Sequence, residues 1–179
     1  MTRIFNLLLT ISLLLGSTSC ASWDPEGEAN LLQEAASTLK VFRARDPGMQ
    51  RFFDNAYAYA VFPTIGKGGM GIGGAYGDGL VYRYGRPIAR TSLTQVTLGL
   101  QLGGQTYHEI IFLRDKTAFE RFKSGRLKLS AQLSAVAATA GASADASYEQ
   151  GVAVFTLARG GLMYEASLGG QSFSYEPLK

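Results

Sequence analysis

Residues 58–79 read AYAVFPTIGKGGMGIGGAYGDG, a glycine-rich segment that constrains the fold more than any other part of the chain. Eight glycines lie between Gly66 and Gly79, so propensity alone would make this segment a poor helix or strand. Tertiary contacts must therefore hold it in place. We predict a bent strand that enters a hairpin at Asp78-Gly79, because this dipeptide supplies the positive φ angles of a type I′ turn. Leu80 to Tyr84 (LVYRY) then form the returning strand.

Glycine-rich loops also bind phosphates, and Gly66, Gly68 and Gly71 match the spacing G-x-G-x-x-G. A dinucleotide loop needs a helix directly after it, and residues 72–77 (IGGAYG) cannot form a stable one. A P-loop needs Ser or Thr after its lysine, and Gly68 follows Lys67. We therefore interpret these glycines as structural.

The first residues have the pattern of a secretory signal. Arg3 is followed by a twelve-residue apolar run from Ile4 to Leu15 and then by small residues up to Ser19. The run is too short to span a bilayer comfortably as a permanent anchor. We predict a signal peptide at residues 1–19.

Cys20, the single cysteine of the chain, directly follows this signal. A bacterial lipoprotein signal peptidase would cleave there and leave a lipidated cysteine carrying palmitate or similar acyl chains. Ordinary cleavage next to Ala21 is the alternative, because Ser17 stands where such sites usually carry leucine. We predict lipid attachment at Cys20, a lipidated N-terminus and linker at 20–30, and one domain at 31–179.

Composition excludes several classes of function. Removing Arg3 with the signal leaves 16 basic and 14 acidic side chains from the 17 and 14 of the chain, a net charge of about +2, so bulk charge does not indicate nucleic-acid binding. His108 is the single histidine, and no G-x-S-x-G motif accompanies it, so a hydrolase triad lacks its parts. With one histidine and one cysteine, the chain has too few of the usual ligands for a zinc site. We predict no enzyme, no cofactor and no metal, and interpret His108 as structural.

Helical signals flank the glycine-rich segment. Asp24-Pro25 followed by acidic residues predicts a helix to about Arg43, and Met49 to Asn55 predicts a second short one. Asp115 predicts the start of a third, which ends at Gly125.

Most other segments alternate as strands. Period-two or continuous apolar patterns predict strands in five segments: residues 96–102, 107–113, 127–146, 152–168 and 171–175. For the alanine-rich segment 127–146, a helix is the alternative. The sequence LGGQ occurs at Leu102 and again at Leu168, where glycine would permit a strand to bend. The expected fold is α+β and mainly β, a coiled antiparallel and barrel-like sheet. The N-terminal helices and one short inserted helix would cover its openings.

One local excess of positive charge runs from Arg114 to Lys128, with six basic and two acidic residues. Such a run is usually a solvated face. Beside an anionic membrane, each basic residue contributes roughly 1 kcal/mol of binding free energy. The candidate lipid-binding residues are Lys67, Lys116, Arg121, Lys123, Arg126 and Lys128.

Four motifs in order resemble the SYLF domain family, in its bacterial lipid-binding lipoprotein branch. They are AVFP at 60–63, the glycines that follow Lys67, QLGGQ at 101–105, and GGLMYEASLGGQSF at 160–173. The resemblance implies binding of membrane lipids without catalysis, and eukaryotic relatives are associated with phosphoinositide membranes and actin. Glu165 stands where those relatives commonly carry glycine, so actin binding is not carried over.

The expected function is therefore that of a non-catalytic, lipid-binding envelope lipoprotein. Its anchor would place it at the outer membrane, facing the periplasm, and its partners would be anionic membrane lipids. The alternatives are a small outer-membrane β-barrel, since the mature length suits about eight strands, or a structural envelope protein.

Overall fold

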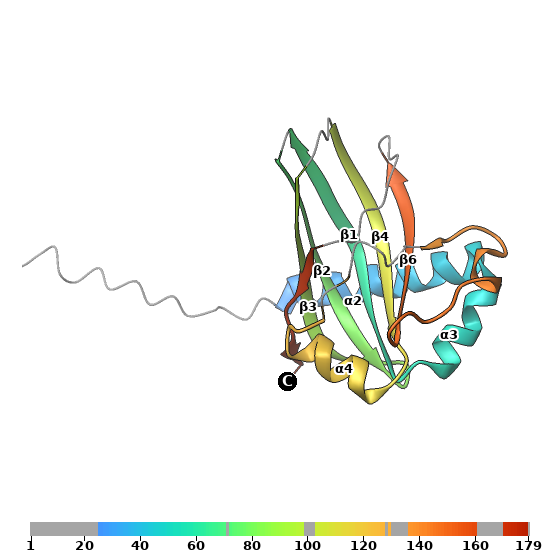
Figure 1. Cartoon of the computed structure of the whole chain (residues 1–179). Coiled ribbons are helices and arrows are strands. Elements are labelled where there is room, and N and C mark those ends of the chain that lie inside the picture. The colour runs from blue at the N-terminus through green and yellow to red at the C-terminus, as the bar shows by residue number, and fades with distance from the viewer. Residues whose placement is uncertain are drawn as a thin grey trace, which may run out of the picture.

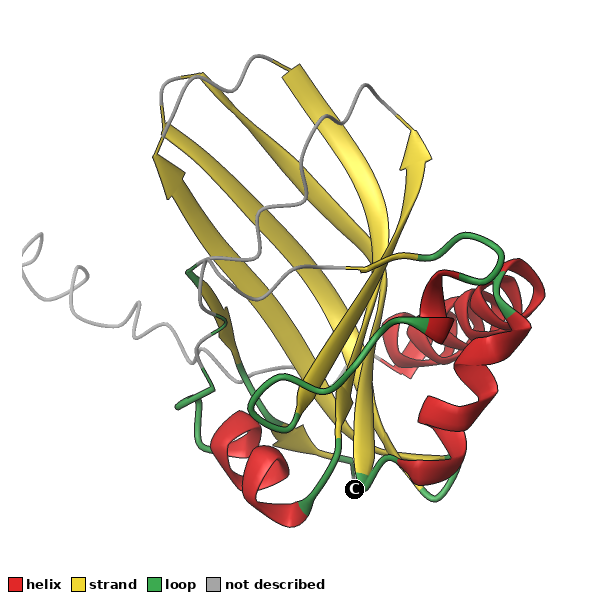
Figure 2. Cartoon of the chain, turned by 45° about the vertical axis from the view of Figure 1, so that its right-hand side comes forward, coloured by secondary structure: helices red, strands yellow, loops and turns green. Residues whose placement is uncertain are grey.

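The computed structural model describes residues 25–70, 72–98, 103–127, 129, 136–160 and 170–178. Within them, a twisted sheet of eight strands carries helices on both faces (Figures 1 and 2). Hydrogen-bonded neighbours follow the order β5-β6-β4-β1-β2-β3-β7, and β8 also pairs with β3. All pairs are antiparallel except β5 with β6. The mainly β, α+β expectation is confirmed, but the described strands form an open path that does not close into a barrel.

The strands are β1 (Ala58–Met70), β2 (Ile72–Arg83), β3 (Arg86–Leu98), β4 (Gly103–Leu113), β5 (Val136–Ala137), β6 (Val152–Gly160), β7 (Gln171–Phe173) and β8 (Glu176–Pro177). The α-helices are α2 (Pro25–Arg45), α3 (Gln50–Asn55) and α4 (Lys116–Lys123), and two short 3₁₀ turns occupy Pro47–Met49 and Ala142–Ala144. The predicted helices therefore all form. None of these described helices is long and apolar enough to cross a membrane.

The predicted hairpin turn at Asp78-Gly79 is wrong, because both residues lie inside β2. The chain reverses around residue 71, with Met70 paired to Ile72. A Cβ on Gly79 would lie 2.5 Å from the Val61 carbonyl oxygen. Position 79 therefore needs glycine so that β2 can pack closely against β1, and not because its φ angle is positive. The positive-φ pair lies at the next turn, where Tyr84 and Gly85 have φ angles of 52° and 73°.

Strand β1 is irregular around Pro63. Its register against β2 shifts between Val61 and Gly66, and its register against β4 shifts between Phe62 and Ile65. Proline has no amide proton to donate, so a bulge is the usual way for a central strand to contain one. Strand β1 therefore continues through Pro63 to Met70.

Two apolar clusters cover opposite faces of the sheet. Helices α2 and α3 pack on one face, where Phe42 and Phe52 meet Ile110 and Phe155. Helix α4 packs on the other with its buried Phe119 and Phe122. The sequence had suggested that the helices cover the openings of a barrel-like sheet. They cover the two faces of an open sheet instead.

The third alternating segment is described only in part, because residues 128 and 130–135 lie outside the described residues. Among its described residues, only Val136–Ala137 are in a strand, and Ala142–Ala144 form a 3₁₀ turn. Leu127 and Leu129 are buried in the α4 cluster without strand pairing. Residues 161–169 lie outside the described residues, so the strand expected from Leu162 to Leu168 is not described; Cys20, Lys128 and Glu165 are not described either.

Candidate functional site

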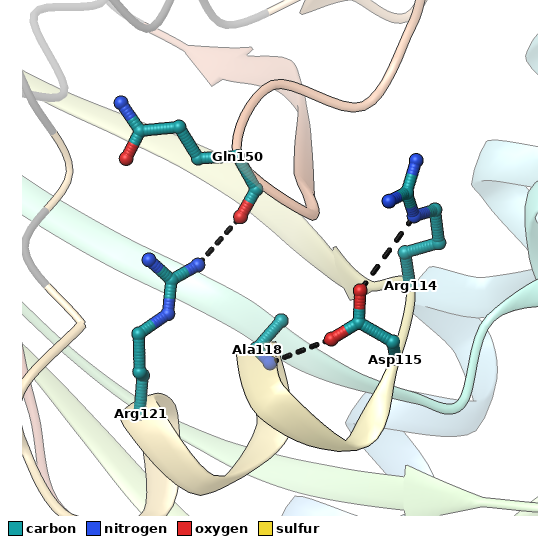
Figure 3. Close-up of polar contacts among 5 residues, drawn as sticks. All are labelled: Arg114, Asp115, Ala118, Arg121 and Gln150. Atoms are coloured by element: carbon teal, nitrogen blue, oxygen red, sulfur yellow. Dashed lines mark hydrogen bonds and ion pairs between the residues drawn. The ribbon is translucent and has the colours of Figure 1, made fainter.

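Helix α4 positions the basic residues predicted to contact lipid. Asp115 begins it, and its Oδ1 accepts a hydrogen bond of 2.9 Å from the Ala118 amide (Figure 3). Gly125 ends it with a φ of 67°, which favours glycine. Phe119 and Phe122 bury one side of α4 in the core. The opposite side consequently faces solvent.

Three of the predicted residues are exposed on α4 or just after its end: Lys116, Lys123 and Arg126. The Lys123 Nζ lies 5.6 Å from the centre of the Tyr175 ring, a cation–π distance. The Arg126 Nε donates to the Ser124 Oγ at 2.9 Å. We call these three residues the α4 surface.

Arg121 and Arg114 differ in role. Arg121 is only partly exposed, and its guanidinium donates to the Gln150 carbonyl oxygen at 2.5 Å, which ties α4 to the turn before β6 (Figure 3). Arg114 is exposed, with its Nε 3.6 Å from the Asp115 Oδ2. The hydrogen bond of Arg121 thus helps to hold the fold, while Arg114 lines a separate pocket with Phe52 and Tyr148.

Lys67 does not lie with these residues. Lys67 lies within β1, where it pairs with Ala75 of β2 and Gln105 of β4. Its side chain is only 9% exposed. Because β1 continues through the glycines, Lys67 is buried within the sheet and is separate from the α4 surface.

An exposed aromatic turn at the same end of the sheet was missed. Tyr84, between β2 and β3, is 83% exposed. The Arg83 guanidinium lies 4.2 Å from the Tyr57 ring centre and 4.9 Å from that of Tyr84. Tyr57 in turn contacts Phe119 of α4, with ring centres 5.6 Å apart. The available signal was YRYGR at 82–86, in which aromatic and basic residues alternate at a turn.

His108 is half-buried on the α2 face of the sheet. Its Nδ1 is within hydrogen-bond distance of the Pro63 carbonyl oxygen. Burial lowers the pKa of His108, an effect that the Pro63 hydrogen bond partly opposes. The described residues hold no group of His, Cys, Asp and Glu side chains arranged to bind a metal.

Glu109 lies in the sheet on the α4 face and has no exposed surface. The Gln171 Nε2 donates to its Oε2 at 3.3 Å, while the Oε1 has no hydrogen-bond partner among the described groups. Burial raises the pKa of this carboxyl to about 8. Glu109 is therefore mostly protonated at neutral pH.

Comparison with known proteins identifies relatives of this chain. Residues 94–176 match the model of the Ysc84 (SYLF) family, described as Las17-binding protein actin regulator. The chain is also 27% identical over 128 residues to the Beta cell expansion factor A of Aeromonas veronii. That alignment covers 71% of this chain and 49% of the relative, so the chain spans about half the length of the curated protein it matches.

Proposed function

Because residues 94–176 carry the domain of the Ysc84 (SYLF) family, we propose that this protein is a non-catalytic lipid-binding lipoprotein of the cell envelope. Acyl chains on Cys20 anchor it to the outer membrane, facing the periplasm. The folded domain separately contacts anionic lipid head groups through the α4 surface.

The observation that carries this proposal is the exposure of several cations at one end of the sheet. Lys116, Lys123 and Arg126 are all exposed. Near an anionic leaflet each such charge contributes roughly 1 kcal/mol of binding free energy. The exposed Tyr84 has the amphipathic ring typical of membrane interfaces.

The anchor and the surface are tested separately. Intact-mass measurement of the protein from its own envelope should find acyl chains on an N-terminal Cys20. An unmodified chain beginning at Ser22 would remove the lipoprotein part of the proposal. The Cys20→Ser protein should be recovered in the soluble periplasmic fraction.

Vesicle flotation tests the α4 surface without the anchor. Protein beginning at Ser22 should bind anionic vesicles at low salt and dissociate as the Debye length falls from about 30 Å at 0.01 M to about 10 Å at 0.1 M. Vesicles of neutral lipid should bind it poorly. The double variant Lys123→Glu/Arg126→Glu should lose most of the binding, because each exposed cation becomes an anion.

The matched control is Lys40→Glu/Arg45→Glu, which makes the same charge change at exposed positions of α2, on the other face of the sheet. This control should bind nearly as well as the parent protein. Equal losses in both variants would mean that net charge alone governs binding. Binding that survives both salt and the α4 variant would indicate apolar contacts with lipid and contradict the α4 assignment.

A further inference from the structure

A polar pocket of about 500 Å³ lies on the face of the sheet opposite α4. Helix α2 forms one wall with amide, hydroxyl and carboxylate side chains, and Pro63, His108 and Arg159 from β1, β4 and β6 form the other. Pockets of this size bind small molecules. The lining includes no residue of the α4 surface, so this site is independent of the function proposed above.

His108 lines this pocket, and its neutral ring has one hydrogen-bond acceptor. Its Nδ1 faces the Pro63 carbonyl oxygen, and the Thr38 Oγ1 lies 3.5 Å from the same nitrogen. A carbonyl oxygen only accepts, so Nδ1 carries the proton of the neutral ring. The Nε2 is then left with its lone pair. An acceptor favours a ligand group that donates N–H or O–H.

Two fixed charges of opposite sign also line the pocket, Glu34 from α2 and Arg159 from β6. Both are near enough to act electrostatically on His108. Although both residues are described, no ion pair joins them. Arg159 uses its Nη1 to donate to the Thr64 hydroxyl, and a guanidinium has further donors for a ligand.

We propose that this pocket binds a small zwitterion, whose oxyanion contacts Arg159 and whose primary ammonium contacts Glu34 and the Nε2 of His108. A simple anion would be attracted by Arg159 but repelled by Glu34, and a simple cation would be attracted by Glu34 but repelled by Arg159. A molecule that carries both charges satisfies both residues. Its oxyanion is a phosphate or a carboxylate, since a guanidinium binds either in the same forked geometry.

Calorimetric titration of the purified mature protein with O-phosphoethanolamine tests this proposal. Each charge-assisted hydrogen bond contributes about 1.5–3 kcal/mol, so this probe should bind at least about tenfold more tightly than ethanolamine or glycerol phosphate. Phosphocholine should also bind weakly, because its quaternary ammonium has no N–H to donate. β-Alanine tests the carboxylate form of the same zwitterion.

Single substitutions locate the site. Arg159→Gln and Glu34→Gln should each weaken binding of O-phosphoethanolamine by about tenfold, while their thermal unfolding stays near that of the parent protein. The matched controls are Arg86→Gln and Glu120→Gln, which remove the same charges at exposed positions outside the pocket lining. They should bind as the parent does.

Vesicles distinguish a lipid head group from a free solute. If phosphatidylethanolamine in neutral vesicles increases flotation above phosphatidylcholine alone, and Glu34→Gln abolishes the increase, the pocket binds lipid. Binding of the soluble probe without any such increase supports a free zwitterion as the ligand. The proposal is overturned if O-phosphoethanolamine binds no better than ethanolamine and glycerol phosphate, or if both pocket variants bind like the controls.

Discussion

Glu109 should make the protein less stable as pH rises from neutral to mildly alkaline. Its carboxyl has no exposed surface, and burial raises its pKa from 4.5 to about 8. Above pH 4.5 the unfolded chain loses this proton while the folded chain keeps it until about pH 8. Across that interval, ionisation of the carboxyl lowers the free energy of the unfolded state but not that of the folded state. The free energy of unfolding therefore falls as pH rises.

The size of the effect follows from the interval of pH. Each unit within it costs about 1.4 kcal/mol of unfolding free energy. His108 has a lowered pKa and gives the opposite slope below its ordinary value of 6.5, since there the unfolded chain alone takes up a proton. Between pH 6.5 and 8 only Glu109 of these two contributes, so the loss is about 2 kcal/mol.

Urea unfolding followed by circular dichroism at pH 6.5, 7, 7.5 and 8 measures this loss. The parent protein should show the full decline, and Glu109→Gln should remove it, because glutamine keeps the shape and has no proton to release. Glu120→Gln, at an exposed position of α4, should decline as the parent does. A Glu109→Gln protein whose stability falls in parallel with the parent would refute the buried, protonated carboxyl.

Three further outcomes follow from the described contacts. Gly79→Ala should lose about 1–3 kcal/mol of unfolding free energy, because the new Cβ would lie 2.5 Å from a backbone oxygen, whereas Gly66→Ala, with nothing within 4 Å, should change little. Asp115→Ala should cost about 0.5–2 kcal/mol by removing the cap of α4, measured by thermal unfolding against Asp145→Ala at an exposed position. In a Glu109→Gln background, stability should fall as pH drops below 6.5, and adding His108→Gln should flatten that part of the profile.

Features decided by neighbouring residues could be predicted from the sequence. The cap at Asp115 and the glycine after α4 both act within a few residues, so the helix was correctly placed. The hairpin turn was placed wrongly, because glycine is required at position 79 by the nearby Val61 carbonyl oxygen of another strand. An Asp-Gly pair looks the same in either role.

Long-range contacts explain what else was missed. Glu109 and Gln171 are 62 residues apart, and only the fold brings them together. A weaker signal was present, since Glu109 alternates with the buried residues Tyr107 and Ile111 and so had to face the core. Lys67 was misplaced for a similar reason: nothing local shows that a glycine-rich segment will pair on both sides.

The irregularity of β1 at Pro63 divides the central strand into two blocks of pairing, interrupted at nearly the same level against both neighbours. The block from Ala58 to Phe62 is held between the two apolar clusters. The block from Gly66 onward is mostly glycine and offers few side chains to either cluster. Amide hydrogens from Gly66 onward should therefore exchange with solvent through local opening. Those from Ala58 to Phe62 should exchange only through global unfolding.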